Sequence, residues 1–321
     1  MDECDHLDTD EVPFPQRPIV ILGAGIIGCA TARQLLLNGF PVILVAEYLP
    51  GDQNIYYASA WAGAAWHAAG GITPDQRYLQ AVTHRILLKM AQDGPEAGVS
   101  IVNAREYLEQ KPAPDSAIWD PTRHMPYLKK QVESLGGHFI RQRVESLQEL
   151  YDIFPESRVF INASGWGSKT LTDVQDDNCF PERGQNVFLA TDQCHTLYLR
   201  NGKEYTYVIP RPLSNGVILG GVKQQGNLSP EVDMDIAWDE IARAHRLAPE
   251  IVPEQPAADK VSYIIGIRPS RKGGFRLESE RKGNRVVLSA YGFGGGGFAF
   301  SYGIADALVK MVERVERENV I

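Results

Sequence analysis

The chain has 321 residues, of which 44% are hydrophobic and 22% charged, with a formal net charge of −8 and a pI near 5.5. These are ordinary values for a globular protein, the length allows two domains, and the acidic balance argues against nucleic acid as a partner. No CxxC or metal-ligand spacing connects the cysteines, so we expect reduced thiols and no metal site. They are Cys4, Cys29, Cys179 and Cys194.

The two ends of the chain carry no targeting or membrane signal that we can recognise. Residues 1–15 are acidic and lack the basic and apolar regions of a signal peptide, so we expect a disordered lead. The apolar stretch 286–309 is interrupted by the sequence GFGGGG, which disfavours a membrane span. The last residues are ENVI rather than a Ser-Lys-Leu type peroxisomal signal.

The most informative segment is VILGAGIIGCATARQLLLNGFPVILVAE, beginning at Val20. It predicts a strand, a glycine turn with Gly23, Gly25 and Gly28, a helix to about Asn38 and a second buried strand over residues 42–45. Glu47 ends that strand 19 residues after the last glycine, which is close to the spacing of a carboxylate that binds a ribose hydroxyl. The segment therefore predicts a dinucleotide-binding unit.

Beyond this unit, apolar spacing predicts helices from Asp75 to about Asp93 and, with Asp120 as N-cap, from Pro121 to about Leu135. The segment 56–71 is too irregular for a helix and too apolar for a surface loop, which is typical of a chain that wraps a ligand. A strand from His138 and a buried strand ending near Ala163 follow, the latter entering a small-residue turn at Ser164 and Gly165.

The second half reads first as an antiparallel sheet, with strands GQNVFLA, HTLYLR, EYTYVIP and GVILGGVK between residues 185 and 223. Further predicted elements are a helix over 235–247, strands over 262–267, 275–277 and 286–290, and a final helix from about 299 to 316. We expect the antiparallel sheet to face a substrate.

Several segments together resemble, in order and over nearly the whole chain, the FAD-dependent D-amino-acid and D-aspartate oxidases, particularly the fungal ones. They are ILGAGIIGCATA, ASAWAGAAW, INASGWGSK, ERGQNV, YVIPRP, IGIRPSRKGGFRLE and VLSAYGFGGGGFAFSYGIA. One position departs from the family pattern, because Ser289 stands where the family usually has histidine, and the region between His67 and Asp120 is shorter than in typical members.

The resemblance implies an α/β fold in which a Rossmann-like FAD-binding domain carries a second, mainly antiparallel-sheet substrate domain. We expect the FAD-binding domain over residues 16–75, 138–185 and 280–321, and the substrate-binding domain over 76–137 and 186–279. It also implies an intracellular protein, peroxisomal as in the family, with the cytoplasm as the alternative because the C-terminal signal is lacking. A homo-oligomer is compatible with the sequence.

FAD, bound non-covalently, is the cofactor that the resemblance implies. The helix N-terminus after Gly25 would lie under the pyrophosphate, and the backbone of the late glycine loop would face the flavin. The loop's alternative role is that of a flexible surface linker. The residues expected to contact FAD are Gly23, Ala24, Gly25, Ile26, Ile27, Gly28, Glu47, Ser59, Ala62, Gly63, Val144, Ser164, Gly165, Gly294, Gly295, Gly296, Gly297, Phe298 and Ala299.

In the resembled family the flavin takes a hydride from Cα, O2 reoxidises it to give H2O2, and the imino acid hydrolyses to a 2-oxo acid. No side-chain base is needed, so the protein's task is orientation. Arg268 matches the arginine that binds the α-carboxylate in a two-pronged pair, and Tyr207 matches a tyrosine that supports it. Without the motif match, Arg268 would be interpreted as part of a surface ion pair and Tyr207 as a core residue.

Lys223 matches a position that is tyrosine in fungal general oxidases and arginine in D-aspartate oxidases, which suggests a cation for a side-chain carboxylate. His67 could donate a hydrogen bond from the opposite wall. The alternatives are a solvated strand end for Lys223 and a satisfied loop residue for His67. Lys223 shares a face with Tyr207 only if the intervening turn has an odd number of residues.

We therefore expect a D-amino-acid oxidase that favours D-aspartate and D-glutamate, with the small-molecule amino acid and O2 as its partners and no membrane or nucleic acid. A general oxidase of neutral D-amino acids is the alternative. An NAD-dependent dehydrogenase and a non-catalytic flavin-binding protein are the further candidates.

Overall fold

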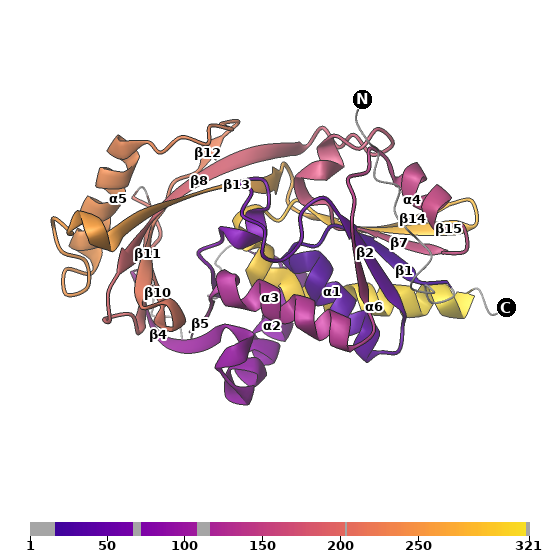
Figure 1. Cartoon of the computed structure of the whole chain (residues 1–321), viewed down its shortest axis with the longest axis horizontal. Coiled ribbons are helices and arrows are strands. Elements are labelled where there is room, and N and C mark those ends of the chain that lie inside the picture. Colours follow the sequence, from indigo (N-terminus) through magenta and orange to yellow (C-terminus); the bar gives the residue numbers. More distant parts are fainter. Residues whose placement is uncertain (1–16, 67–71, 108–115, 203, 319–321) are drawn as a thin grey trace, which may run out of the picture.

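The computed structural model describes residues 17–66, 72–107, 116–202 and 204–318. Two β-sheets lie side by side, each with helices of its own (Figure 1). The disordered lead expected over residues 1–15 lies outside the described residues, as does His67. No described helix has the length and hydropathy needed to cross a membrane.

The first sheet has the strand order β14-β15-β7-β1-β2-β6. All its pairs are parallel except the one between β14 and β15 at the edge. The strands are β1 (Ile19–Leu22), β2 (Val42–Ala46), β6 (His138–Arg141), β7 (Val159–Asn162), β14 (Arg276–Lys282) and β15 (Arg285–Tyr291). This is the parallel α/β sheet that the glycine motif predicts.

The central strands are continuous apolar runs because both faces of the sheet are covered. On one face α1 (Ile26–Leu37) and α6 (Gly297–Glu318) pack over Ile21, Leu44 and their neighbours. On the other face α4 (Leu147–Ile153), a helix that the sequence analysis did not predict, packs over Val20 and Ile43.

The two predicted middle helices are confirmed as α2 (Pro74–Asp93) and α3 (Pro121–Ser134). Thr73 begins α2 with a reciprocal capping box to Gln76, and Asp120 caps α3 by accepting from the Thr122 N–H. Both helices pack against the α1 and α6 layer, although they fall within the stretch assigned to the substrate domain. The domain division stays a prediction.

The second sheet has the order β12-β8-β11-β10-β9-β4-β5-β3, with β13 paired to β8. Its helix α5 (Met234–Leu247) covers the outer face, and the apolar side chains of the other face include Tyr207 and Ile209. The strands are β3 (Ala65–Trp66), β4 (Val99–Tyr107), β5 (Ser116–Trp119), β8 (Cys179–Ala190), β9 (Thr196–Arg200), β10 (Thr206–Arg211), β11 (Gly216–Gly220), β12 (Gln224–Gln225) and β13 (Val261–Arg271).

Several strand limits in this sheet differ from the expectation. β13 pairs with β8 over its whole length, from Val261 opposite Leu189 to Arg271 opposite Cys179, and both strands are longer than predicted. β11 ends at Gly220, before Lys223. β4 and β5 were not predicted, and β4 joins β9 in parallel; the other described pairs are antiparallel, so the sheet is mainly antiparallel as expected. In Figure 1, β8 and β13 extend from this sheet toward the first one.

Candidate active site

A cavity of about 790 Å³ lies where the carboxyl ends of the first sheet's strands meet the inner face of the second sheet. Ligands of open α/β sheets bind at this edge. Of the residues expected to contact FAD, the following line the cavity: Gly23, Ala24, Gly25, Ile26, Ile27, Glu47, Ser59, Ala62, Gly63, Val144, Ser164, Gly165, Gly294, Gly295, Gly296, Gly297, Phe298 and Ala299.

The glycine turn between β1 and α1 has no room for side chains. Gly23 has a φ of +106°, and a Cβ there would lie 2.4 Å from the Ala163 carbonyl oxygen. A Cβ on Gly28 would lie 1.9 Å from the Gly23 oxygen, so Gly28 supports the turn from beneath. Gly25 caps α1 without a side chain, which leaves a helix N-terminus open to the cavity, where a pyrophosphate would be favoured.

Ser59 and Tyr57 connect this turn to the next loop. The Ile26 N–H donates to Ser59 Oγ (2.9 Å), and the Tyr57 hydroxyl donates to the Ala24 carbonyl (2.8 Å). Glu47 lies directly after β2 with an exposed side chain, beside Tyr48 at the same cavity. These positions fit the nucleotide end of FAD.

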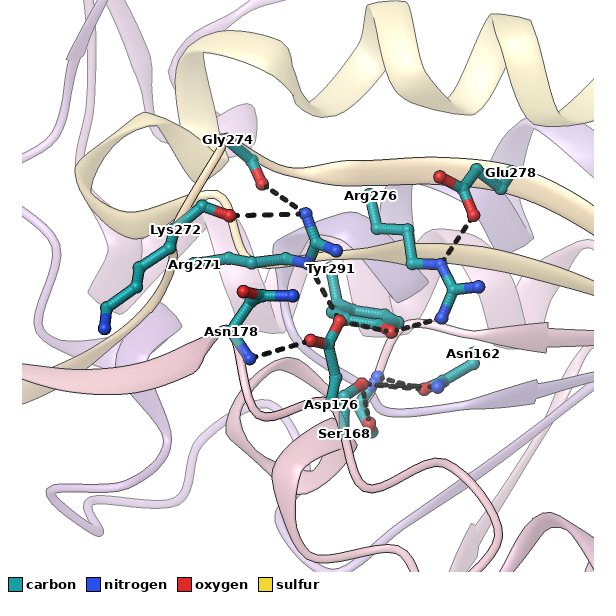
Figure 2. Close-up of polar contacts among 11 residues, drawn as sticks. Asn162, Ser168, Asp176, Asn178, Arg271, Lys272, Gly274, Arg276, Glu278 and Tyr291 are labelled. Atoms are coloured by element: carbon teal, nitrogen blue, oxygen red, sulfur yellow. Dashed lines mark hydrogen bonds and ion pairs between the residues drawn. The ribbon is translucent and has the colours of Figure 1, made fainter.

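The late glycine loop is part of the cavity wall and not a solvated linker. It forms a single 3-10 turn over Gly294–Gly296 and leads directly into α6 at Gly297. The strand that enters it is fixed by charged groups (Figure 2): the Tyr291 hydroxyl donates to Asp176 (3.0 Å) and accepts from Arg276 (2.9 Å), while Arg271 Nε also donates to Asp176 (2.8 Å).

The turn after β7 is held by its own polar side chains. The Asn162 amide donates to Ser168 Oγ (3.2 Å), and the Asn162 oxygen accepts from the Ser164 N–H (3.1 Å), as Figure 2 shows for the Asn162 and Ser168 pair. Ser289, the position that departs from the family pattern, is buried on β15 opposite Asn162 and does not line the cavity.

The inner face of the second sheet brings Tyr207 and Arg268 to the same cavity. The Tyr207 hydroxyl donates to Asn186 Oδ1 (2.5 Å) on β8. Burial raises the pKa of Tyr207 well above its ordinary value, with the Arg268 charge opposing the rise, so the phenol stays protonated. Arg268 Nη1 donates to the Val222 carbonyl (2.9 Å) and lies 3.4 Å from Glu182 Oε1.

Lys223 also lines the cavity, although the odd-numbered turn that would put it on the same face as Tyr207 does not occur. The turn of residues 212–215 has four residues and pairs Tyr207 with Gly220, which would place Lys223 on the opposite face of a continued strand. Because β11 ends at Gly220, Lys223 is free of that alternation, and its Nζ lies 5.1 Å from the Tyr205 ring centroid. The Tyr205 and Tyr207 rings are 5.5 Å apart.

Sequence reasoning missed three residues of this wall. Gly184 and Asn186 lie on β8 at alternate positions, and Tyr205 lies two residues before Tyr207. The period of two in ERGQN could have placed Glu182, Gly184 and Asn186 on one face, but only the pairing of β8 with β13 shows that this face meets Arg268.

The described cysteines are all buried. Cys29, Cys179 and Cys194 are free and buried, and burial raises the pKa of the Cys179 thiol to about 11. No cluster of His, Cys, Asp and Glu with metal-binding geometry occurs among the described residues.

A parallel sheet with an open glycine turn is the arrangement of dinucleotide-binding proteins, and here it shares its cavity with a second sheet that presents Arg268 and Lys223. The chain belongs to the FAD dependent oxidoreductase (DAO) family, whose model matches residues 18–110 and 112–311. FAD is its cofactor, and the cradle around Gly23 and Gly28 fits the nucleotide without side-chain obstruction.

Relatives of known name cover nearly the whole chain. A D-amino-acid oxidase of Schizosaccharomyces pombe is 32% identical over 330 residues, covering 90% of this chain and 94% of its own length. A D-aspartate oxidase of Talaromyces thermophilus is 30% identical over 363 residues, covering 94% and 96%. Among solved structures, glycine oxidase from Geobacillus kaustophilus shares the fold, with a TM-score of 0.74 at 16% identity and coverage of 94% and 95%.

Proposed function

We propose that this FAD-dependent D-amino-acid oxidase-like enzyme favours acidic D-amino acids, such as D-aspartate and D-glutamate. When bound, FAD supplies the acceptor for a hydride from Cα, and O2 regenerates it with release of H2O2. Overall, the D-amino acid, O2 and water give a 2-oxo acid, ammonia and H2O2.

The chain's own residues bind and orient the substrate. Arg268 presents its guanidinium at the cavity beside Tyr207, and a planar fork of donors suits a carboxylate better than an ammonium would. Tyr207 stays a neutral hydroxyl and can turn from Asn186 toward the same carboxylate. Holding the α-carboxylate at two points fixes the orientation of that group in the cavity.

One observation carries the acidic preference: Lys223 brings a second cation to the part of the cavity wall that the second sheet forms and that already holds Arg268. The charge of Arg268 is partly balanced by Glu182, whereas the ammonium of Lys223 lies over an aromatic ring. A substrate with a second carboxylate would gain a charge-assisted hydrogen bond there. His67, the other residue proposed for the side chain, lies outside the described residues.

A preference for neutral D-amino acids is the second candidate, and the apolar side chains of the same wall favour it. Leu197, Leu199 and Ile209 line the cavity together with Tyr205. The relatives named above include both a D-amino-acid oxidase and a D-aspartate oxidase, so they support either substrate class.

The deciding experiment is the flavin spectrum of the purified holoenzyme under anaerobic conditions. We expect D-aspartate to bleach the flavin absorbance and L-aspartate to leave it unchanged. Steady-state kcat/KM should then be higher for D-aspartate than for D-alanine or D-valine. Bleaching by D-alanine with the higher kcat/KM would reject the acidic preference, and no bleaching by any D-amino acid would reject the oxidase.

A further inference from the structure

A buried ion pair behind the cavity holds together segments that are distant in the sequence. Arg211, the last residue of β10, is buried, with 6% of its side chain exposed. Its Nη1 donates to Asp120 Oδ1 at 3.0 Å. Its Nε donates to the Gly63 carbonyl at 2.8 Å, and its Nη2 donates to the Ala62 carbonyl at 2.7 Å and also to that of Gly63. All three kinds of nitrogen in the guanidinium are therefore used.

Asp120 is fixed from several sides as well. Its Oδ1 accepts from the Thr122 N–H (3.2 Å) and hydroxyl (2.6 Å), and its Oδ2 accepts from the Ser214 hydroxyl. Burial would raise the pKa of Asp120, but the Arg211 charge and these donors hold it below its ordinary value. The carboxylate is thus ionised and preorganised as the partner of Arg211.

The carbonyls that Arg211 binds belong to residues of the cavity wall. Ala62 and Gly63 both line the cavity, between the 3-10 turn over Ala58–Ala60 and β3. Gly63 lies so close to β10 that a Cβ there would come within 2.7 Å of Ile209 Cδ1. The same strand therefore carries Tyr207 toward the substrate, supports Gly63 through Ile209 and fixes its carbonyl through Arg211.

We propose that Arg211 is a positioning residue that, with Asp120 as its counterion, sets the Ala62–Gly63 backbone against bound FAD and so aligns the cofactor with the substrate wall. This inference rests on the proposed placement of FAD in the cavity. Arg211 does not itself line the cavity, so it acts through the two carbonyls. Lysine cannot replace it, because one ammonium cannot reach two carbonyls and a carboxylate in these directions.

The test is the Arg211→Lys variant, which keeps the charge and removes the fork. We expect FAD to dissociate from the holoenzyme roughly 10- to 100-fold more readily, as for the loss of hydrogen bonds from a charged donor. The FAD-saturated variant should have an altered flavin absorption envelope and a lower kcat with D-aspartate, with a smaller change in KM. Free FAD fluorescence after dilution measures the first effect, and absorbance and initial rates measure the others.

Arg123→Lys is the matched control. Arg123 lies on the exposed side of α3, and its Nη2 donates to the Leu213 carbonyl (2.8 Å) in the turn after Arg211, without contacting Ala62 or Gly63. It should leave FAD dissociation, spectrum and kcat unchanged. If Arg211→Lys does not fold, Asp120→Asn provides the second test, because the amide oxygen can still accept from Thr122 while the counterion is lost.

The outcomes separate the two proposals. If wild-type flavin is bleached by a D-amino acid, yet Arg211→Lys matches it in FAD dissociation, spectrum and kcat, the positioning role is wrong and the proposed function stands. A variant that only melts at a lower temperature, with unchanged FAD dissociation and spectrum well below that temperature, would likewise reduce Arg211 to a stability role. If no D-amino acid reduces wild type, the proposed function itself fails.

Discussion

The guanidinium of Arg268 lies directly over Gly184, so that a Cβ on Gly184 would come within 2.4 Å of Nη2 and 2.6 Å of Cζ. The two residues lie on the adjacent strands β13 and β8. Arg268 is directly opposite Glu182, which is two residues before Gly184. The missing side chain on β8 therefore creates the space in which the Arg268 guanidinium rests.

Gly184→Ala should displace that arginine without unfolding the sheet, since the atoms in the way are the mobile end of a long side chain. We expect KM for D-aspartate to rise roughly 10- to 100-fold, as for a misplaced charged hydrogen bond, while FAD stays bound. Steady-state kinetics on the FAD-saturated variant measure the change. A double-mutant cycle gives the control: in an Arg268→Ala background the same alanine should have almost no further effect.

Lys223→Met should lower kcat/KM for D-aspartate by roughly 10- to 100-fold, because the second substrate carboxylate loses a charged partner. The value for D-alanine should stay constant, since methionine keeps the apolar stem over Tyr205. Lys272→Met, at an exposed turn away from the cavity, controls for the change in net charge. Equal losses for both substrates would contradict a role in side-chain selection.

The local parts of this fold could be predicted from the sequence because their determinants are close together. Gly23 needs glycine because of its own φ of +106°, and Gly28 because a Cβ there would meet the Gly23 carbonyl five residues earlier. Glu47 directly follows the next strand of the same unit. The predicted cap at Asp120 satisfies the Thr122 N–H two residues away, and the cap at Thr73, which was not predicted, is equally local. Such signals do not depend on the tertiary partner.

What could not be predicted depends on where strands end and which strands meet. The position of Lys223 follows from β11 ending at Gly220, and alternation within a strand does not say where the strand stops. The contact of Arg211 with Gly63 joins residues 148 positions apart, and the one between Tyr291 and Asp176 joins residues 115 apart. Polar side chains buried in this way look like surface residues in the sequence.

Tyr291→Phe should destabilise the protein and weaken FAD binding. The hydroxyl links Asp176 to Arg276 behind the glycine loop, and its loss should cost about 1–3 kcal/mol in the free energy of unfolding, as for a hydrogen bond to a charged group. Urea unfolding of the holoenzyme measures the change. Tyr263→Phe, at an exposed position on β13, is the control and should stay near wild type; equal stability of the two variants would contradict the role of the Tyr291 hydroxyl.

The buried carboxyl group of Glu240 should make the protein's free energy of unfolding depend on pH. It lies on α5, buried against the outer face of the second sheet, and neither carboxyl oxygen has a hydrogen-bond partner among the described residues. Burial raises the pKa of Glu240 from 4.5 to about 9, and the nearby Asp239 adds to the rise. The charges of Arg243 on the same helix, Arg268 on β13 and Arg183 on β8 oppose it.

The sign of the effect follows from proton counting. Between pH 4.5 and 9 the folded protein holds a proton on Glu240 that the unfolded chain has released, so stability is lost as pH rises through this window, by about 1.4 kcal/mol per pH unit. In Glu240→Gln the side chain is neutral in the folded and in the unfolded protein, so this pH dependence of the unfolding free energy is removed. The variant should match wild type near pH 5 and become progressively more stable by pH 8.

Urea unfolding of the holoenzyme at pH 5, 6, 7 and 8 tests this, with Glu254→Gln as the matched control for the loss of one carboxylate at an exposed position after α5. The difference in unfolding free energy between Glu240→Gln and wild type should grow with pH, whereas the control should show a constant difference. Parallel pH profiles for wild type and Glu240→Gln would mean that the carboxyl is ionised in the folded protein, paired with the arginines around it.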